Sequence, residues 1–109
     1  MSKDKRKKLN KVKSILNRYL NKLEDNGFSV EEAFLFGSYA RGDFREDSDI
    51  DIAVVSSDLI KNKEKYDKFL WHQVIDIDSR IEPIGYVPED FNLSDPLVWE
   101  IKEEGVKIK

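Results

Sequence analysis

Residues 37–51 read Gly-Ser-Tyr-Ala-Arg-Gly-Asp-Phe-Arg-Glu-Asp-Ser-Asp-Ile-Asp, and this stretch decides the fold of the chain. It begins with a glycine–serine pair and ends, after ten further residues, in two aspartates separated by one residue. An apolar run at 33–36 leads into the pair, and a second apolar run at 50–55 threads through the aspartates and continues beyond them. Short apolar runs bounded by turn residues are typical of buried strands. The stretch therefore predicts two strands joined by a turn and a short helix.

Amphipathic patterns on both sides of this stretch predict the remaining elements. Apolar residues recur every three or four positions near the N-terminus, which is typical of a helix with one buried face. Near the C-terminus, Asp95 followed by Pro96 is a helix start signal, and Asn26-Gly27 is a stop signal for the first helix. The sequence predicts helices over 3–25, 38–41, 59–77 and 95–105, and strands over 32–37, 49–56, 80–87 and 106–108.

The two aspartates lie on a predicted strand, where side chains alternate between the two faces. Asp49, Asp51 and Ala53 therefore share one face, and the apolar residues between them share the other. Two neighbouring carboxylates repel each other strongly unless a cation lies between them. Because Mg²⁺ prefers carboxylate oxygens, the pair predicts a divalent-metal clamp.

The turn that precedes the aspartates has the residues that suit a phosphate group. Gly37 allows the backbone to approach a ligand closely, and the amides of Ser38 and Tyr39 at a helix start favour an anion. Arg41, one turn further, has a planar fork that matches phosphate oxygens. Two Mg²⁺ ions about 3.5–4 Å apart stabilise the attacking and leaving oxygens of a phosphoryl displacement. Turn and clamp together predict nucleotidyl transfer, in which a hydroxyl attacks the α-phosphorus of a nucleoside triphosphate.

The composition excludes several other kinds of site. The chain has 109 residues, which suits one domain, and its net charge of −3 lacks the basic excess of a nucleic-acid-coating protein. It has no cysteine, and its single histidine, His72, argues against a zinc site. No apolar run approaches the roughly 20 residues of a membrane span, so we expect a cytoplasmic protein. Trp71 and Trp99 stand at helical spacing with apolar neighbours, which predicts core positions.

On the Gly-Ser turn and the Asp-x-Asp pair, the chain resembles the polymerase-beta-type nucleotidyltransferase superfamily. Within it, the chain is similar to the minimal nucleotidyltransferases of bacteria and archaea, also through Arg80–Ile84 and the closing stretch from Pro96 to Gly105. The resemblance covers nearly the whole chain. It implies one α+β domain over residues 1–109, with a small mixed, twisted sheet flanked by helices.

The resemblance also implies roles for single residues. Gly37 and Ser38 would hold the triphosphate of ATP, with Arg41 in contact with it and Ser48 as a further nucleotide-binding residue. Asp49 and Asp51 would ligate two Mg²⁺ ions. A third carboxylate on a later strand would complete the metal site and accept the proton of the attacking hydroxyl. Glu82 is the preferred candidate because turn signals bound its strand on both sides, and Asp76 is the alternative.

We expect another molecule to present the acceptor of the nucleotide, because residues 1–109 are expected to form the catalytic domain alone. The resemblance implies a partner, since minimal nucleotidyltransferases are commonly paired with a helical HEPN-domain toxin. The expected function is that of an antitoxin that transfers AMP to a tyrosine of the toxin. Two alternatives stay open: an antitoxin that binds and occludes its partner without catalysis, and a small-molecule nucleotidyltransferase of the antibiotic-modifying type. We expect no membrane contact and no direct nucleic-acid binding, and the sequence leaves self-association open.

Overall fold

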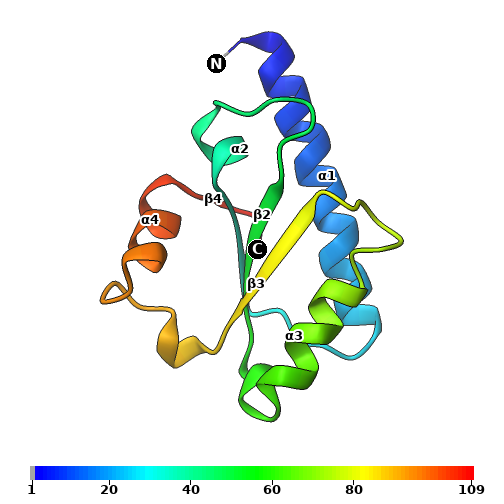
Figure 1. Ribbon diagram of the computed structural model, residues 1–109, viewed down its shortest axis with the longest axis vertical. Helices are drawn as coiled ribbons and strands as arrows, with labels where there is room; N and C mark the ends of the chain where they lie inside the picture. Colours follow the sequence, from blue (N-terminus) through cyan, green and yellow to red (C-terminus); the bar gives the residue numbers. More distant parts are fainter. Residues whose placement is uncertain (1) are drawn as a thin grey trace.

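The backbone of the computed structural model is a four-stranded sheet with helices on both faces, described for residues 2–109 (Figure 1). The strand order is β3-β2-β1-β4, with β1 antiparallel to both β2 and β4, and β2 parallel to β3. This confirms the predicted mixed sheet. The elements are α1 (Lys3–Asp25), β1 (Glu32–Phe36), α2 (Ser38–Arg41), β2 (Ile50–Val55), the 3₁₀-helix η1 (Ser57–Ile60), α3 (Lys63–His72), β3 (Ile81–Tyr86), the 3₁₀-helix η2 (Pro88–Asp90), α4 (Pro96–Glu104) and β4 (Val106–Lys107).

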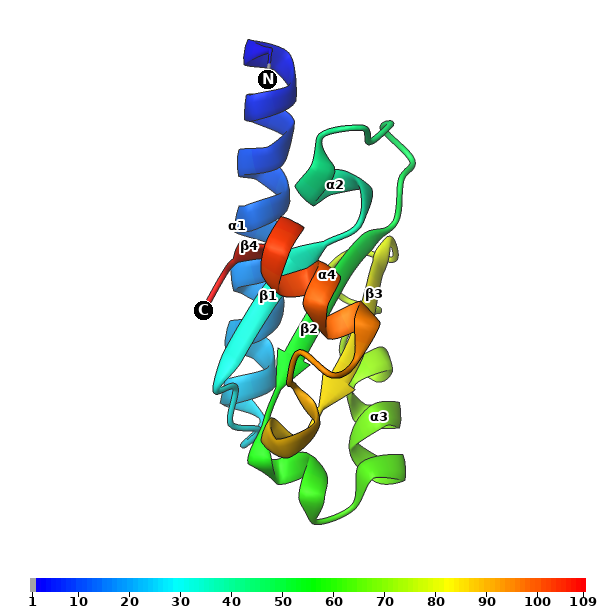
Figure 2. The ribbon, with the colours of Figure 1, turned by 90° about the vertical axis from the view of Figure 1, so that its left-hand side faces the viewer.

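The alternation along β2 separates two hydrophobic clusters, one on each face of the sheet. The even-numbered residues of β2, among them Ile50 and Ile52, pack against α1 and α3. Residues of the other parity, Ala53 and Val55, pack against α4 together with Phe91. Figure 2 shows α4 in front of the sheet and α1 behind it. The predicted alternation is therefore confirmed within β2, and it leaves Asp51 on the face that α4 covers, while Asp49 directly precedes the strand.

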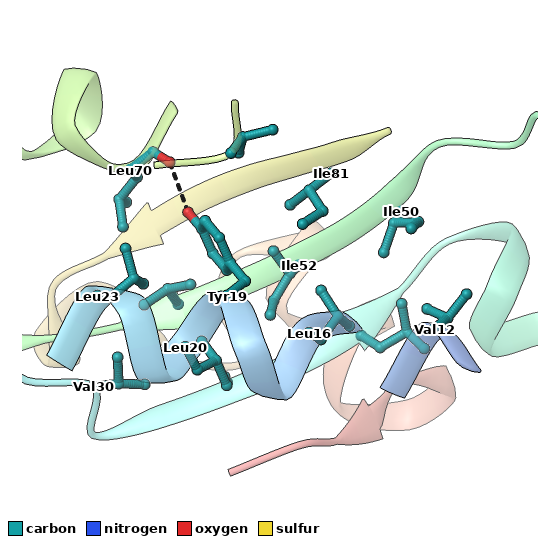
Figure 3. Packing of buried hydrophobic residues seen from close by; sticks show 14 of the residues in the cluster. Val12, Leu16, Tyr19, Leu20, Leu23, Val30, Ile50, Ile52, Leu70 and Ile81 are labelled. Atoms are coloured by element: carbon teal, nitrogen blue, oxygen red, sulfur yellow. Dashed lines mark hydrogen bonds between the residues drawn. The ribbon is translucent and has the colours of Figure 1, made fainter. Parts of the chain in front are cut away.

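The larger cluster is built around the apolar stripe of α1 (Figure 3). Leu16, Tyr19 and Leu23 are completely buried there. The hydroxyl of Tyr19 donates a hydrogen bond of 2.8 Å to the carbonyl of Leu70, which links α1 to α3. Burial raises the pKa of the Tyr19 hydroxyl above its ordinary value. Since a buried polar group without a partner is costly, this bond determines how α3 sits against α1.

The predicted helix over 59–77 is wrong in its extent. Ser56 accepts a hydrogen bond from the amide of Asp58 and starts a separate 3₁₀-helix. Asn62 then caps a new helix by accepting from the amide of Lys65 at 3.1 Å. The helix ends at His72, and turns follow it. Two local caps therefore divide a segment that apolar spacing alone predicts as continuous.

The predicted core positions of the two tryptophans are also wrong. Trp71 is 51% exposed and Trp99 is 52% exposed. Their neighbours Leu70 and Val98 point into the core instead. A helix of nine or ten residues has one narrow buried stripe, and the smaller side chains occupy it in both helices.

Among the described residues, no helix combines the length and the apolar character that crossing a bilayer requires.

Replacing Tyr19 by phenylalanine tests the link between α1 and α3. The substitution leaves the Leu70 carbonyl without its partner, so we expect a loss of about 1–2 kcal/mol in the free energy of unfolding. In a domain of this size, that corresponds to a fall of roughly 5–10 °C in Tm. Thermal unfolding followed by circular dichroism measures the change. Tyr66→Phe is the control, because the Tyr66 hydroxyl makes no hydrogen bond within residues 2–109; an equal effect of both variants would contradict the assignment.

Candidate active site

Three strands and one short helix meet at one end of the sheet. Because β1 runs antiparallel to β2, the last residue of β1, Phe36, pairs with Asp51 near the start of β2. Because β3 runs parallel to β2, Asp51 also pairs with Glu82 near the start of β3. Residues that pair directly across strands point to the same face. The register therefore brings Glu82 beside Asp51, with α2 standing at the same end of the sheet (Figure 2).

The Gly37 backbone is in contact with the Asp51 carboxylate. Gly37 has φ +77° and ψ −150°, a conformation that is essentially restricted to glycine. A Cβ atom at this position would overlap the Asp51 carboxylate. Glycine is therefore required at position 37 for two reasons. The backbone conformation needs it, and the Asp51 carboxylate occupies the space of a side chain.

The loop between α2 and β2 holds the other residues of the predicted site. Arg41, in the last turn of α2, lies 3.4 Å from Asp43 and 3.5 Å from Glu100 of α4. The hydroxyl of Ser48 accepts a hydrogen bond of 2.7 Å from the amide of Arg45 and closes the turn before the aspartates. Both side chains lie in the connection between the glycine turn and the aspartate pair, where their positions depend on the conformation of the loop.

Asp51 has the most perturbed carboxyl group of the site. Burial raises its pKa to about 6, and the charges of Glu82 and Asp49 and a hydrogen bond to Glu82 act in the same direction. The positive charge of Arg41 opposes them. Three carboxyl groups therefore act on one another, and among the described residues Arg41 is the cation that lowers the pKa of Asp51.

These carboxylates fit a divalent metal ion in charge and in donor type. Mg²⁺ takes hard oxygen ligands, and a cation beside Asp51 would relieve the repulsion that raises its pKa. Within residues 2–109, however, no three His, Cys, Asp or Glu side chains are already gathered around one point. Asp49 and Glu82 are exposed, whereas Asp51 is partly buried.

The alternative third carboxylate, Asp76, lies elsewhere. It follows α3 in an exposed turn and forms an ion pair of 2.9 Å with Lys22 of α1. A hydrogen bond from Lys22 and the charge of that lysine lower the pKa of Asp76. The structure thus brings Glu82, and not Asp76, to the aspartate pair, while the chemical role of Glu82 stays a prediction.

Arg80 lies just before β3 and not within it, although the predicted strand over 80–87 includes it. β3 begins at Ile81, and the guanidinium of Arg80 lies on the α1 side in a cleft that is also lined by Tyr39 and Glu46. It donates to both carboxylate oxygens of Asp78. Sequence reasoning missed this pair, although an aspartate two residues before an arginine at a strand start is a usable signal.

The chain is similar to several known proteins. The family model of the nucleotidyltransferase domain matches residues 7–108. A relative from Methanocaldococcus jannaschii, named "putative protein adenylyltransferase", is 31% identical over 81 residues, which cover 72% of this chain and 79% of that protein. Two further relatives of the same description and organism match over about half of their own length.

Solved structures share the fold. A crystal structure titled as a "putative nucleotidyltransferase" from Sulfolobus solfataricus has a TM-score of 0.67 at 21% identity and covers 98% of this chain and 87% of that one. A toxin–antitoxin crystal structure with AMP-PNP has a TM-score of 0.60 at 22% identity, covering 89% and 72%. At this identity the likeness concerns the fold alone.

Replacing Gly37 by alanine tests the contact with Asp51. Gly27→Ala is the matched control, because Gly27 also has a positive φ of +84° but no atom within 4 Å of an added Cβ. We expect Gly27→Ala to cost about 1–2 kcal/mol in the free energy of unfolding and Gly37→Ala at least about 1 kcal/mol more. Urea unfolding measures both values. In an Asp51→Ala background the excess should shrink, and an unchanged excess would show that the carboxylate does not cause it.

Replacing Asp51 by asparagine tests whether burial and the neighbouring carboxylates destabilise the charged form of Asp51. A folded-state pKa raised from 3.8 to about 6 favours the fold at low pH, and this contribution is lost as pH rises from about 4 to about 6. Asp51→Asn removes the cost of the charge, so at pH 7.5 without divalent cations we expect a gain of about 1–2 kcal/mol after allowance for solvent screening. Thermal unfolding at pH 4 and 7.5 measures the difference. The gain should be much smaller at pH 4, and an equal gain at both values would contradict the assignment.

Proposed function

The chain belongs to the nucleotidyltransferase domain family, and on that premise we propose that it transfers AMP from ATP to a hydroxyl group of a partner protein. The observation that carries the proposal is the junction of Gly37, Asp51 and Glu82 at one end of the sheet. A glycine turn that admits a phosphate beside a cluster of carboxylates is the arrangement that nucleotidyl transfer needs. Residues 1–109 form the catalytic domain in this proposal.

Asp49, Asp51 and Glu82 would hold the Mg²⁺ ions. When bound, these ions neutralise the triphosphate and lower the pKa of the attacking hydroxyl. Glu82, exposed beside Asp51, then accepts the proton of that hydroxyl as the new oxygen–phosphorus bond forms. The bond between the α-phosphorus and pyrophosphate breaks in the same displacement, so that AMP stays on the acceptor.

The glycine turn and the loop after it would orient the triphosphate. The backbone of Gly37 would contact the phosphate chain, and the amide and hydroxyl of Ser38 would donate to it. Arg41 would exchange its weak, exposed contacts with Asp43 and Glu100 for a phosphate oxygen. The oxygen of Ser48 already accepts from Arg45, which leaves its hydroxyl proton free to donate to the nucleotide.

The acceptor in this proposal is a tyrosine of a helical HEPN-type toxin, and the chain is the antitoxin of the pair. Two observations support this assignment. Relatives are named protein adenylyltransferases, and a structure with the same fold is titled as a toxin–antitoxin with AMP-PNP. A site that lies open at the end of a sheet also leaves room for an acceptor that another protein presents.

The test is a transfer assay with a HEPN-type toxin as the acceptor, ATP labelled at the α-phosphate, and Mg²⁺. We expect label on the partner, located by mass spectrometry on a tyrosine, and its loss with EDTA. Glu82→Gln should lower the rate by about 10²–10⁴-fold, as is typical of a lost general base. Asp76→Asn is the matched control, and it should transfer normally because Asp76 lies with Lys22.

Two outcomes would contradict the proposal. If Asp49→Asn neutralises the toxin as well as the unmodified chain does, the protein acts by occlusion and not by catalysis. If Glu82→Gln retains its rate while Asp76→Asn loses it, the third carboxylate has been assigned to the wrong segment.

A further inference from the structure

The side chain of Arg80 joins three segments that are separate in the sequence. Its guanidinium donates to the hydroxyl of Tyr39 in α2 at 3.1 Å and to the carbonyl of Glu46 in the following loop at 3.0 Å. It is held in place by Asp78, with distances of 3.1 Å from Nε to Oδ1 and 2.8 Å from Nη2 to Oδ2. Its own carbonyl accepts from the amide of Ile50 at 2.8 Å, at the start of β2.

Each segment that Arg80 holds carries a residue of the candidate site. Tyr39 is adjacent to Ser38, Glu46 lies three residues before Asp49, and Arg80 itself lies two residues before Glu82. The guanidinium reaches these segments from the α1 side of the sheet, whereas the carboxylates lie on the α4 side. It therefore touches none of the groups that would bind the nucleotide.

Besides Arg80, a few contacts restrain this loop: the Lys5 ammonium donates to the Gly42 carbonyl, and the Ser48 hydroxyl accepts from the Arg45 amide. Between α2 and β2 the described backbone bonds are those of Gly42 and Asp43 to Ser38 and of Ser48 to Arg45. Tyr39 adds a buried anchor, because its ring stacks on Phe44 with 4.4 Å between the centroids and its hydroxyl donates to the Arg45 carbonyl. A loop with so few bonds has many conformations of similar energy unless a tertiary contact selects one.

We infer that Arg80 is a positioning residue, which sets the distance between the phosphate-binding turn and the carboxylates through Tyr39 and the Glu46 carbonyl. The expected effect of Arg80 on the transfer rate rests on the proposed function, whereas its expected effect on the loop does not. An arginine suits this position because its fork engages Asp78 on one side and two oxygen acceptors on the other. A lysine has a single point of charge and cannot span all three segments.

The test compares Arg80→Gln, Arg80→Lys and Tyr39→Phe with the control Lys8→Gln. Lys8 lines the same cleft, and its ammonium lies 3.7 Å from the Glu46 carboxylate. Two quantities are measured at a temperature where every variant is folded by circular dichroism. The first is the hydrogen exchange of the amides at 42–48, and the second is kcat and KM for ATP in the transfer assay.

We expect both Arg80 variants to exchange these amides at least about tenfold faster than the unmodified chain, and Tyr39→Phe to show a smaller increase. Because an error of about 1 Å in the placement of reacting groups costs about 10²-fold, kcat should fall by about 10–100-fold. KM should stay within about threefold, since the groups that bind ATP are still present. Lys8→Gln should change neither quantity.

The two measurements separate the inference from the function on which it rests. If the unmodified chain transfers no AMP, the proposed function fails, and hydrogen exchange alone decides whether Arg80 holds the loop. If exchange at 42–48 is unchanged in Arg80→Gln, the inference is overturned whatever the activity. An active enzyme whose kcat does not respond to Arg80→Gln overturns it as well.

Discussion

The contact between the Asp51 carboxylate and the Gly37 backbone is the constraint on which the site depends. This contact exists because the end of β1 lies beside the start of β2. The turn at Gly37 and the Asp51 carboxylate therefore lie against each other. Only a residue without a side chain leaves room for the carboxylate, and only glycine readily adopts the φ and ψ of this turn. The absence of a side chain at Gly37 thus allows both the backbone conformation of the turn and the position of the Asp51 carboxylate.

The same junction is electrostatically unfavourable in the free protein. Burial and two neighbouring carboxylates raise the pKa of Asp51, whereas charged groups elsewhere, such as Asp78 beside Arg80, have partners that lower theirs. Perturbed carboxyl groups of this kind are concentrated at functional sites. A divalent cation beside these carboxylates would relieve this repulsion, as the proposed function requires.

The two faces of the sheet differ in how they are packed and how far they are exposed. The α1 side has the larger core, with the buried Tyr19 bond between helices and the Arg80 contacts behind the loop. The α4 side has the smaller cluster and the open carboxylates. Packing on one face can therefore hold groups on the other face in place, so that the end of the sheet with the carboxylates stays accessible.

Local pattern determined much of this protein. Apolar spacing of 3.6 and 2 residues is enough to predict α1 and the strands, and the alternation along β2 by itself places both aspartates on one face. Which distant residues lie beside the aspartates depends on the tertiary structure alone. The parallel pairing of β3 with β2 places Glu82 beside Asp51, whereas Asp76 forms an ion pair with Lys22 elsewhere. The tertiary structure also decided that Trp71 and Trp99 are exposed and that Arg80 faces Tyr39. Periodicity reports which face of one element is apolar, but strand order and the competition for core volume depend on contacts between segments far apart in the chain, and no local pattern contains them.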